Sequence, residues 1–156
     1  MERDKLFLRK AITLAKESIK AGGGPFGAVI VKDNVIVAEA SNSVVTDSDP
    51  TAHAEINVIR IAAARLSSHE LTGCTLYSSC EPCPMCFGAI YWAGIKRVVY
   101  GGSRVSAERA GFSDKFIYDE IALFPDTSTV DFLKLLDAEA EEVFEVWLNT
   151  DGRIQY

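Results

Sequence analysis

One histidine, one glutamate and two cysteines have the residue types and the spacing of a metal-dependent catalytic site. His53 and Glu55 stand two residues apart, and further along the chain Cys83 and Cys86 stand three residues apart. One imidazole and two thiolates make the three protein ligands that a catalytic zinc takes, because its fourth position must stay open for water. A carboxylate close to the histidine could take the proton of that water and give it back. The pattern therefore indicates metal-activated water chemistry.

A third cysteine allows a different interpretation of the same motif. Cys80, Cys83 and Cys86 fall at three-residue intervals, so with the histidine they could form a closed structural zinc site. That interpretation leaves the glutamate without a role, and a structural zinc is more typical of small domains that lack a core. We expect Cys80, like Cys74, to be a buried thiol near a strand end instead.

The elements that would hold these residues start at the ligands themselves. The sequence predicts helices over 51–66 and 82–93, which places His53 in the first turn of one helix and Cys83 and Cys86 in the first turn of the other. Prolines at the start of the second helix suit that position, where a missing N–H costs little. Two helix N-termini would then point at one place, where their partial positive charge favours thiolate over thiol.

The remaining pattern predicts an α/β fold. Helices are expected over 4–20, within 106–121 and over 138–149, the last with Val143, Val146 and Trp147 facing inward. Apolar and β-branched runs predict strands over 26–31, 35–40, 75–79, 97–101 and 130–136. A first hairpin followed by strands that alternate with helices implies one mixed sheet between helical layers. We expect a single domain over 1–156, with 150–156 as a C-terminal arm.

Length, charge and cysteine placement narrow the setting. The chain has 156 residues and a formal net charge of −6, so it lacks the basic balance expected of a nucleic-acid-binding protein. Three of the four cysteines fall within 80–86, which is too tight for a disulfide framework and typical of a metal site. The first residues contain no apolar signal-peptide core, and no apolar run is long enough to span a membrane. We therefore expect a cytoplasmic protein with neither a nucleic-acid nor a membrane partner.

Several stretches of the chain together carry a family resemblance. They are residues 24–31, 49–55, 79–86, 88–92, 111–112 and 116–118. These stretches resemble the cytidine-deaminase-like superfamily and, within it, the small bacterial guanine deaminases. The resemblance implies a three-layer α/β/α sandwich with a central five-stranded mixed sheet. It also implies a zinc ion held by His53, Cys83 and Cys86, and the hydrolytic deamination of guanine to xanthine and ammonia.

The same resemblance implies roles for residues around a bound base. Glu55 would take a proton from water and pass protons to a ring nitrogen and to the departing ammonia, and Asp114 would read the purine edge or help to shuttle protons. The substrate-binding residues that it implies are Phe26, Asn42, Ala54, Trp92 and Tyr156. Without the resemblance, Asn42 could equally stabilise its loop, Asp114 could cap a helix, and Tyr156 could lie in a disordered end.

Other functions could use the same motifs. Deamination of another small base or nucleoside, such as cytosine or guanosine, needs only a reshaped pocket. A tRNA adenosine deaminase should carry a basic face, which the net charge of −6 argues against. A zinc-stabilised binding module would have no use for the Glu55 carboxylate.

The C-terminal segment is expected to join two copies of the chain. The resembled guanine deaminases are homodimers with exchanged C-terminal segments, so the resemblance implies that Tyr156 completes the partner's pocket. Asp151 and Gly152 would end the last helix and give the arm a flexible corner. Exchange of a segment is a low-cost route to a symmetric dimer.

Overall fold

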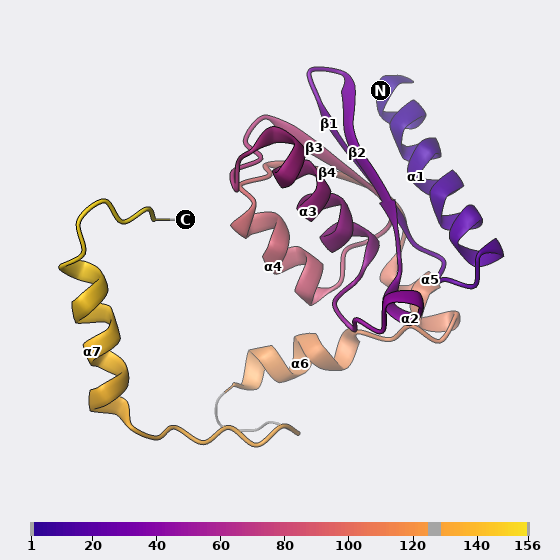
Figure 1. Ribbon diagram of the computed structural model, residues 1–156. Helices are drawn as coiled ribbons and strands as arrows, with labels where there is room; N and C mark the ends of the chain where they lie inside the picture. Colours follow the sequence, from indigo (N-terminus) through magenta and orange to yellow (C-terminus); the bar gives the residue numbers. More distant parts are fainter. Residues whose placement is uncertain (1, 125–128, 156) are drawn as a thin grey trace. The chain divides into compact units, whose positions relative to one another are not determined.

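The computed structural model describes residues 2–124 and 129–155, and Figure 1 labels its helices and strands. The chain forms two compact units, Met1–Asp114 and Lys115–Tyr156. The first unit contains, in chain order, α1 (Glu2–Lys20), β1 (Gly27–Lys32), β2 (Val35–Ser41), α2 (Val44–Asp47), α3 (Ala54–Leu66), β3 (Cys74–Cys80), α4 (Pro84–Trp92), β4 (Arg97–Gly102) and α5 (Arg104–Arg109). The second contains α6 (Lys115–Leu123) and α7 (Asp137–Leu148).

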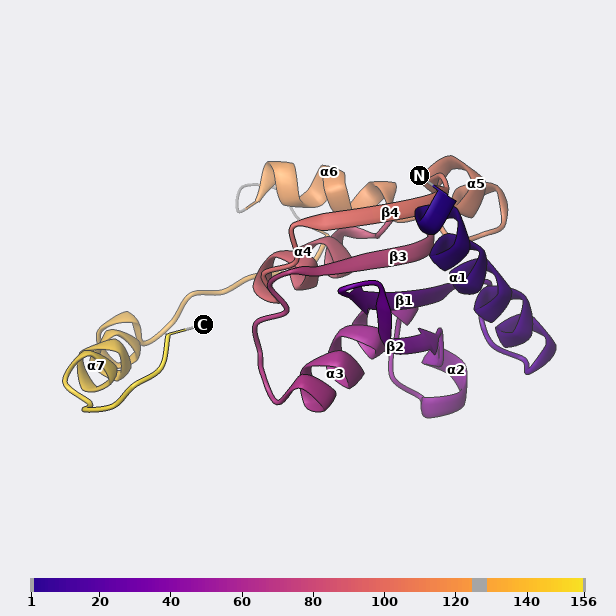
Figure 2. The same cartoon turned by 90° about the horizontal axis from the view of Figure 1, so that it is seen from above.

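The strands form one mixed sheet in the order β2-β1-β3-β4, which Figure 2 shows edge to edge. β1 pairs antiparallel with β2 and β3, whereas β3 and β4 are parallel. The predicted α/β fold with a mixed sheet is confirmed. The prediction of a fifth strand is wrong, because residues 130–136 of the described chain form no strand. Asp131, Lys134 and the adjacent pair Leu135 and Leu136 break the two-residue alternation that a half-buried strand needs.

Side-chain alternation along β1 explains why helices cover both faces of the sheet. Ala28 and Ile30 belong to a core cluster with residues of α3 and α4, whereas Val29 and Val31 belong to a cluster with residues of α1. Figure 1 shows α1 on one side of the sheet and α3 and α4 on the other. An uninterrupted apolar strand is the expected sequence for a position that is buried on both faces.

Hydrogen bonds join the start of α1 to β3 and β4. The Tyr77 hydroxyl and the Arg97 guanidinium both donate to the Asp4 carboxylate, at 2.9 Å and 2.8 Å. These bonds, the one from Arg97 above all, hold the pKa of Asp4 well below its usual range. Asp4 therefore stays ionised and keeps the helix fixed to β3 and β4.

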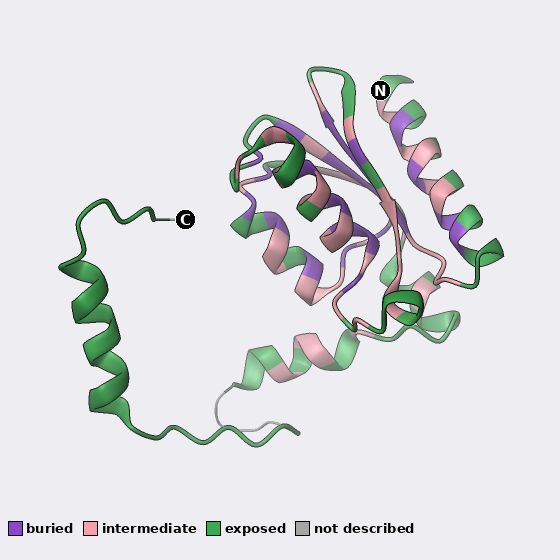
Figure 3. Cartoon of the chain, viewed as in Figure 1, coloured by how far each residue is buried: buried purple, intermediate pink, exposed green. Residues whose placement is uncertain are grey.

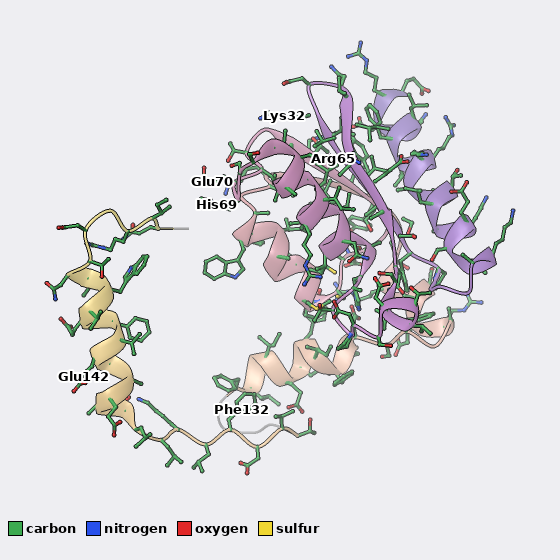
Figure 4. The ribbon with its side chains drawn as sticks, viewed as in Figure 1. Lys32, Arg65, His69, Glu70, Phe132 and Glu142 are labelled. Atoms are coloured by element: carbon green, nitrogen blue, oxygen red, sulfur yellow. The ribbon has the colours of Figure 1, made fainter. Side chains whose placement is uncertain are left out.

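The second unit exposes its apolar side chains. None of its described residues is buried, and Figure 3 shows α7 exposed along its whole length. Val143, Val146 and Trp147 were expected to face inward, but they are exposed, because no described residue of this unit covers α7. Figure 4 labels Phe132 of this unit, which stays exposed although its ring packs edge-to-face on Phe124. Among the described helices, none has both the length and the apolar character to cross a bilayer.

Candidate active site

The predicted metal ligands lie where two helices begin. His53 is the N-cap residue of α3, and Cys83 is the N-cap residue of α4, which starts with Pro84. Cys86 follows in the first turn of α4 and is fully buried. The local sequence explains the start of α4, because proline favours the first helical position. Each of the two helices therefore carries its ligands at its N-terminus.

The three ligand atoms have the spacing that a tetrahedral metal ion requires. His53 Nδ1 lies 3.4 Å from Cys83 Sγ and 3.6 Å from Cys86 Sγ, and all three atoms lie within 4.8 Å of one another. Zinc bonds of about 2.3 Å to sulfur and about 2.0 Å to nitrogen, at tetrahedral angles, place such atoms roughly 3.6 Å apart. The residues present therefore fit a metal ion and leave a fourth direction open.

The two thiols differ, because the hydrogen bond with Cys83 and burial raise the pKa of Cys86, whereas the pKa of Cys83 is lowered. Hydrogen bonds from Cys86 and His53, the one from Cys86 above all, lower the pKa of Cys83 to about 4, although burial opposes this change. The hydrogen bond with Cys83 is also the main reason that the pKa of His53 is raised. At neutral pH the group thus already carries thiolate character, and thiolate is the form that binds metal.

Glu55 lies beside the ligands and is buried, with 4 % of its surface exposed. Burial raises the pKa of its carboxyl group. One carboxylate oxygen, Oε1, accepts a hydrogen bond of 2.7 Å from the Ser78 hydroxyl, and the Cys86 thiol lies 3.5 Å from the other, Oε2. The carboxylate therefore stands within reach of anything bound at the open metal position, as a general acid–base group must.

Sequence reasoning missed two residues that organise this site. Ser78 on β3 bonds Glu55, and only its place on an inward face of an apolar strand could have pointed to it. Asn57 on α3 donates from Nδ2 to Ser41 O, Ser43 Oγ and Ala52 O, at 3.0, 2.9 and 3.3 Å. Asn57 thereby fastens both ends of the loop before α3, which leads directly into His53. An asparagine inside a predicted helix carries no signal for that role.

Cys80 stands apart from the metal group. It ends β3, is buried and donates from Sγ to the Ser103 carbonyl at 3.6 Å. Among the described residues, the group that could hold a metal contains one histidine and two cysteines and omits Cys80. Cys74 lies in the core cluster. Both thiols are buried, as expected, and the closed four-ligand site is not formed.

The predicted substrate-binding residues of the first unit have the following surroundings in the structure. Ala54 is fully buried as the first residue of α3. Phe26 packs edge-to-face on Phe112, with the ring centres 5.0 Å apart. Burial, together with the negative charge of Cys83, raises the pKa of Asp114. Asn42 uses its side-chain oxygen to accept from Val44 N at 3.3 Å, which stabilises the loop and leaves its amide nitrogen for another partner.

One further predicted residue, Trp92, lies at the end of α4 opposite to the ligands. Trp92 is the last residue of α4, and its side chain is 71 % exposed. Trp92 is the eighth residue after Pro84, which corresponds to a rise of about 12 Å along the helix axis. Tyr156 lies outside the described residues.

Comparison with known proteins places this site in a family. Residues 1–102 match the cytidine and deoxycytidylate deaminase zinc-binding region. The chain belongs to this deaminase family. The match covers the sheet and both ligand-bearing helices, and it stops before α5.

Relatives within the family differ in how much of the chain they share. The chain is 50 % identical to guanine deaminase of Bacillus subtilis (strain 168) over 151 residues, which is 96 % of this chain and 97 % of that protein. The crystal structure of guanine deaminase from Bacillus subtilis superposes with a TM-score of 0.95 at 49 % identity, covering 97 % of this chain and 98 % of that one. The tRNA-specific adenosine deaminase of Buchnera aphidicola subsp. Baizongia pistaciae is 46 % identical over 100 residues, covering 64 % of this chain and 62 % of that protein.

Proposed function

We propose that this protein is a zinc-dependent hydrolase that deaminates guanine to xanthine and ammonia. The observation that carries the proposal is the extent of the guanine deaminase match, which covers 96 % of the chain. The tRNA deaminase match covers 64 %, and the family model ends at residue 102. Similarity to the guanine enzyme therefore includes the C-terminal third, which the family model and the tRNA deaminase match leave out.

The residues of the site would divide the chemistry among them. His53, Cys83 and Cys86 would hold zinc, which supplies an activated water at neutral pH when bound. Glu55 Oε2, which faces the ligands, would receive the proton of that water and return it to a ring nitrogen of the base. The burial of Glu55 excludes bulk water as a competing proton carrier and raises the pKa of its carboxyl group, so it can be both base and acid.

The residues next to the ligands would select the base. Asp114 would accept hydrogen bonds from the purine edge, and the Asn42 amide would donate one. Phe26, held by Phe112, would lie against the ring, and Ala54 at the start of α3 would leave room for it. A site that pairs each edge of a base rejects analogues that leave its polar groups unpaired.

An ammonia-release screen tests the substrate. Guanine, guanosine, cytosine, cytidine, adenine and adenosine are compared at equal concentration with zinc-loaded protein. We expect guanine to give the highest kcat/KM by at least about 10²-fold over cytosine and adenine. A preference for cytosine or guanosine would move the chain to deamination of another small base or nucleoside. Activity on tRNA alone would contradict the argument from the net charge of −6.

We further propose that the protein is a homodimer and that residues 150–156 form an arm. Each chain would be one deaminase domain whose arm reaches the second copy, with Tyr156 covering the partner's pocket. The support is the second unit, where apolar residues such as Phe144, Val146 and Leu148 are exposed. Apolar surface of this extent marks an interaction surface rather than a solvated one. Exchange between two copies would bury it without any new partner.

Mixed refolding tests the exchange. Glu55→Gln and a chain truncated after Asn149 are each expected to be nearly inactive, and they are refolded together. If the arms are exchanged, the heterodimer has one pocket with an intact Glu55 and an arm from the other chain, so activity returns. A mixture that stays inactive means that each arm serves its own chain, and a fully active truncated chain means that the arm has no catalytic role.

The four free cysteines fit a cytoplasmic location, where thiols stay reduced.

A further inference from the structure

Strand β3 presents a row of side chains toward α3 and α4, and Ser78 interrupts the apolar character of that row. Cys74 and Leu76 lie in the core cluster of this face, and Ser78 follows at the two-residue spacing of a strand. Ser78 is 1 % exposed, so water cannot satisfy its hydroxyl. Burying an unpaired hydroxyl is unfavourable, and an apolar residue would pack here without that cost. The serine therefore needs a reason other than packing.

The hydrogen bonds of Ser78 give its hydroxyl a fixed direction. Ser78 Oγ accepts from Cys80 N at 3.4 Å and donates to Glu55 Oε1 at 2.7 Å. A backbone amide can only donate, so the single hydroxyl proton is left for the carboxylate. The bond to Glu55 is thus a short hydrogen bond in which the hydroxyl donates and the carboxyl oxygen accepts.

The two oxygens of Glu55 consequently have different surroundings. Oε1 is engaged by the Ser78 hydroxyl on the strand side, whereas Oε2 lies 3.5 Å from the Cys86 thiol on the metal side. A glutamate side chain has several rotamers, and a single turn about its terminal bond would exchange the two oxygens. Among the described residues, buried polar side-chain atoms without a partner are absent, so the arrangement is fully paired.

We propose that Ser78 is a positioning residue for the reaction, which holds Glu55 with Oε1 turned to the strand and Oε2 turned to the reacting atoms. Ser78 bonds Glu55 and the backbone of Cys80, so it would act through Glu55. The inference rests on the proposed function for its chemistry, since a proton-transferring Glu55 is what needs this orientation. A preorganised catalytic group loses activity when its supporting contact is removed, even if its own atoms stay intact.

Four variants separate positioning from structural support. Ser78→Ala removes the hydroxyl, while Ser78→Thr and Ser78→Val have nearly the same size and differ by the hydroxyl alone. The matched control is Ser79→Ala, because Ser79 Oγ accepts from Gly27 N at 3.0 Å, a bond of the same strand that does not reach Glu55. We expect Ser78→Ala and Ser78→Val to lower kcat by roughly 10- to 100-fold, the loss that one hydrogen bond to a charged group represents. KM and metal content should stay near wild type, Ser78→Thr should recover most of kcat, and Ser79→Ala should keep it.

The measurements distinguish this inference from the proposed function. Wild-type protein that releases no ammonia from guanine refutes the proposed substrate, and the variants are then assayed with whichever base the wild type deaminates best. Crystal structures of Ser78→Ala and Ser78→Val give a readout without turnover: we expect the Glu55 carboxylate to turn or to occupy several orientations. A Glu55 that stays in place in both, a kcat that Ser78→Val leaves unchanged, or an equal loss in Ser79→Ala would overturn the positioning role.

Discussion

Replacing Glu55 by glutamine tests the proton-transfer role with the smallest change of shape. Glutamine has almost the same volume, and its amide oxygen can still accept from the Ser78 hydroxyl, which now lies 2.7 Å from Glu55 Oε1. The amide nitrogen would then take the place of Oε2, which lies 3.5 Å from the Cys86 thiol. An amide nitrogen cannot accept a proton, so the variant loses the acid–base function and little else.

The expected loss of turnover is large because nothing can replace the carboxylate. General acid–base groups contribute about 10²- to 10⁴-fold. Glu55 is only 4 % exposed, so bulk water cannot act as a substitute base, and one group serves several proton transfers. We therefore expect the upper end, a fall in kcat of about 10⁴-fold, which corresponds to roughly 5 kcal/mol in the barrier. KM for guanine should change little, because the carboxylate acts chiefly in the transition state.

The assay follows ammonia release from guanine, with zinc per chain and thermal unfolding measured on the same preparations. Burial raises the pKa of Glu55, so its ionised form is disfavoured in the fold, and a neutral glutamine should not lower the melting temperature. Glu39→Gln is the control, since Glu39 pairs with Lys10 on the surface at 3.1 Å and should keep full activity. A Glu55→Gln enzyme with normal zinc and turnover within about tenfold of wild type would refute the mechanism.

Three further predictions concern the metal, the base and the fold. Cys83→Ala and Cys86→Ala should each remove zinc and activity together, whereas Cys80→Ser should retain zinc, as metal analysis would show. Asp114→Ala should lower kcat/KM for guanine while zinc content stays unchanged, so full activity would exclude a role at the base. Asp4→Asn should lower the melting temperature at pH 7, and its difference from wild type should shrink below about pH 4. The sign follows because the folded-state pKa of Asp4 is depressed, so its stabilisation is present above the unfolded value and is lost on acidification through the folded one.

The metal group was predictable because each of its parts is local in sequence. Cys83 and Cys86 lie at a helix start that proline indicates, and the ligand spacing places His53 at the start of another predicted helix. The exclusion of Cys80 was also predictable, since a structural fourth ligand would have left Glu55 unused. Three-dimensional placement then adds only the distances of 3.4 and 3.6 Å between the imidazole and the thiols.

The residues that sequence reasoning missed depend on strand register and on long-range packing. Ser78 reaches Glu55 only because β3 lies in the sheet with this residue turned toward α3, and a neighbouring serine turned the other way looks identical in sequence. The strand predicted over 130–136 does not form, because an apolar stretch without a neighbouring strand has nothing to pair with. Strand formation requires a ladder partner, which composition does not specify.

Topology explains why residues so far apart in the chain converge. β3 ends at Cys80 and the chain turns at once into α4, so Cys83 and Cys86 lie at the carboxyl end of that strand. The chain runs through α3 and back into β3, so α3 packs antiparallel to the strand and its first residues, with Glu55 among them, lie at the same end. Ligand sites of open α/β sheets form at the carboxyl ends of strands for this reason. Ser78 lies near this end of β3 on the face that packs against α3, and from there its hydroxyl reaches Glu55.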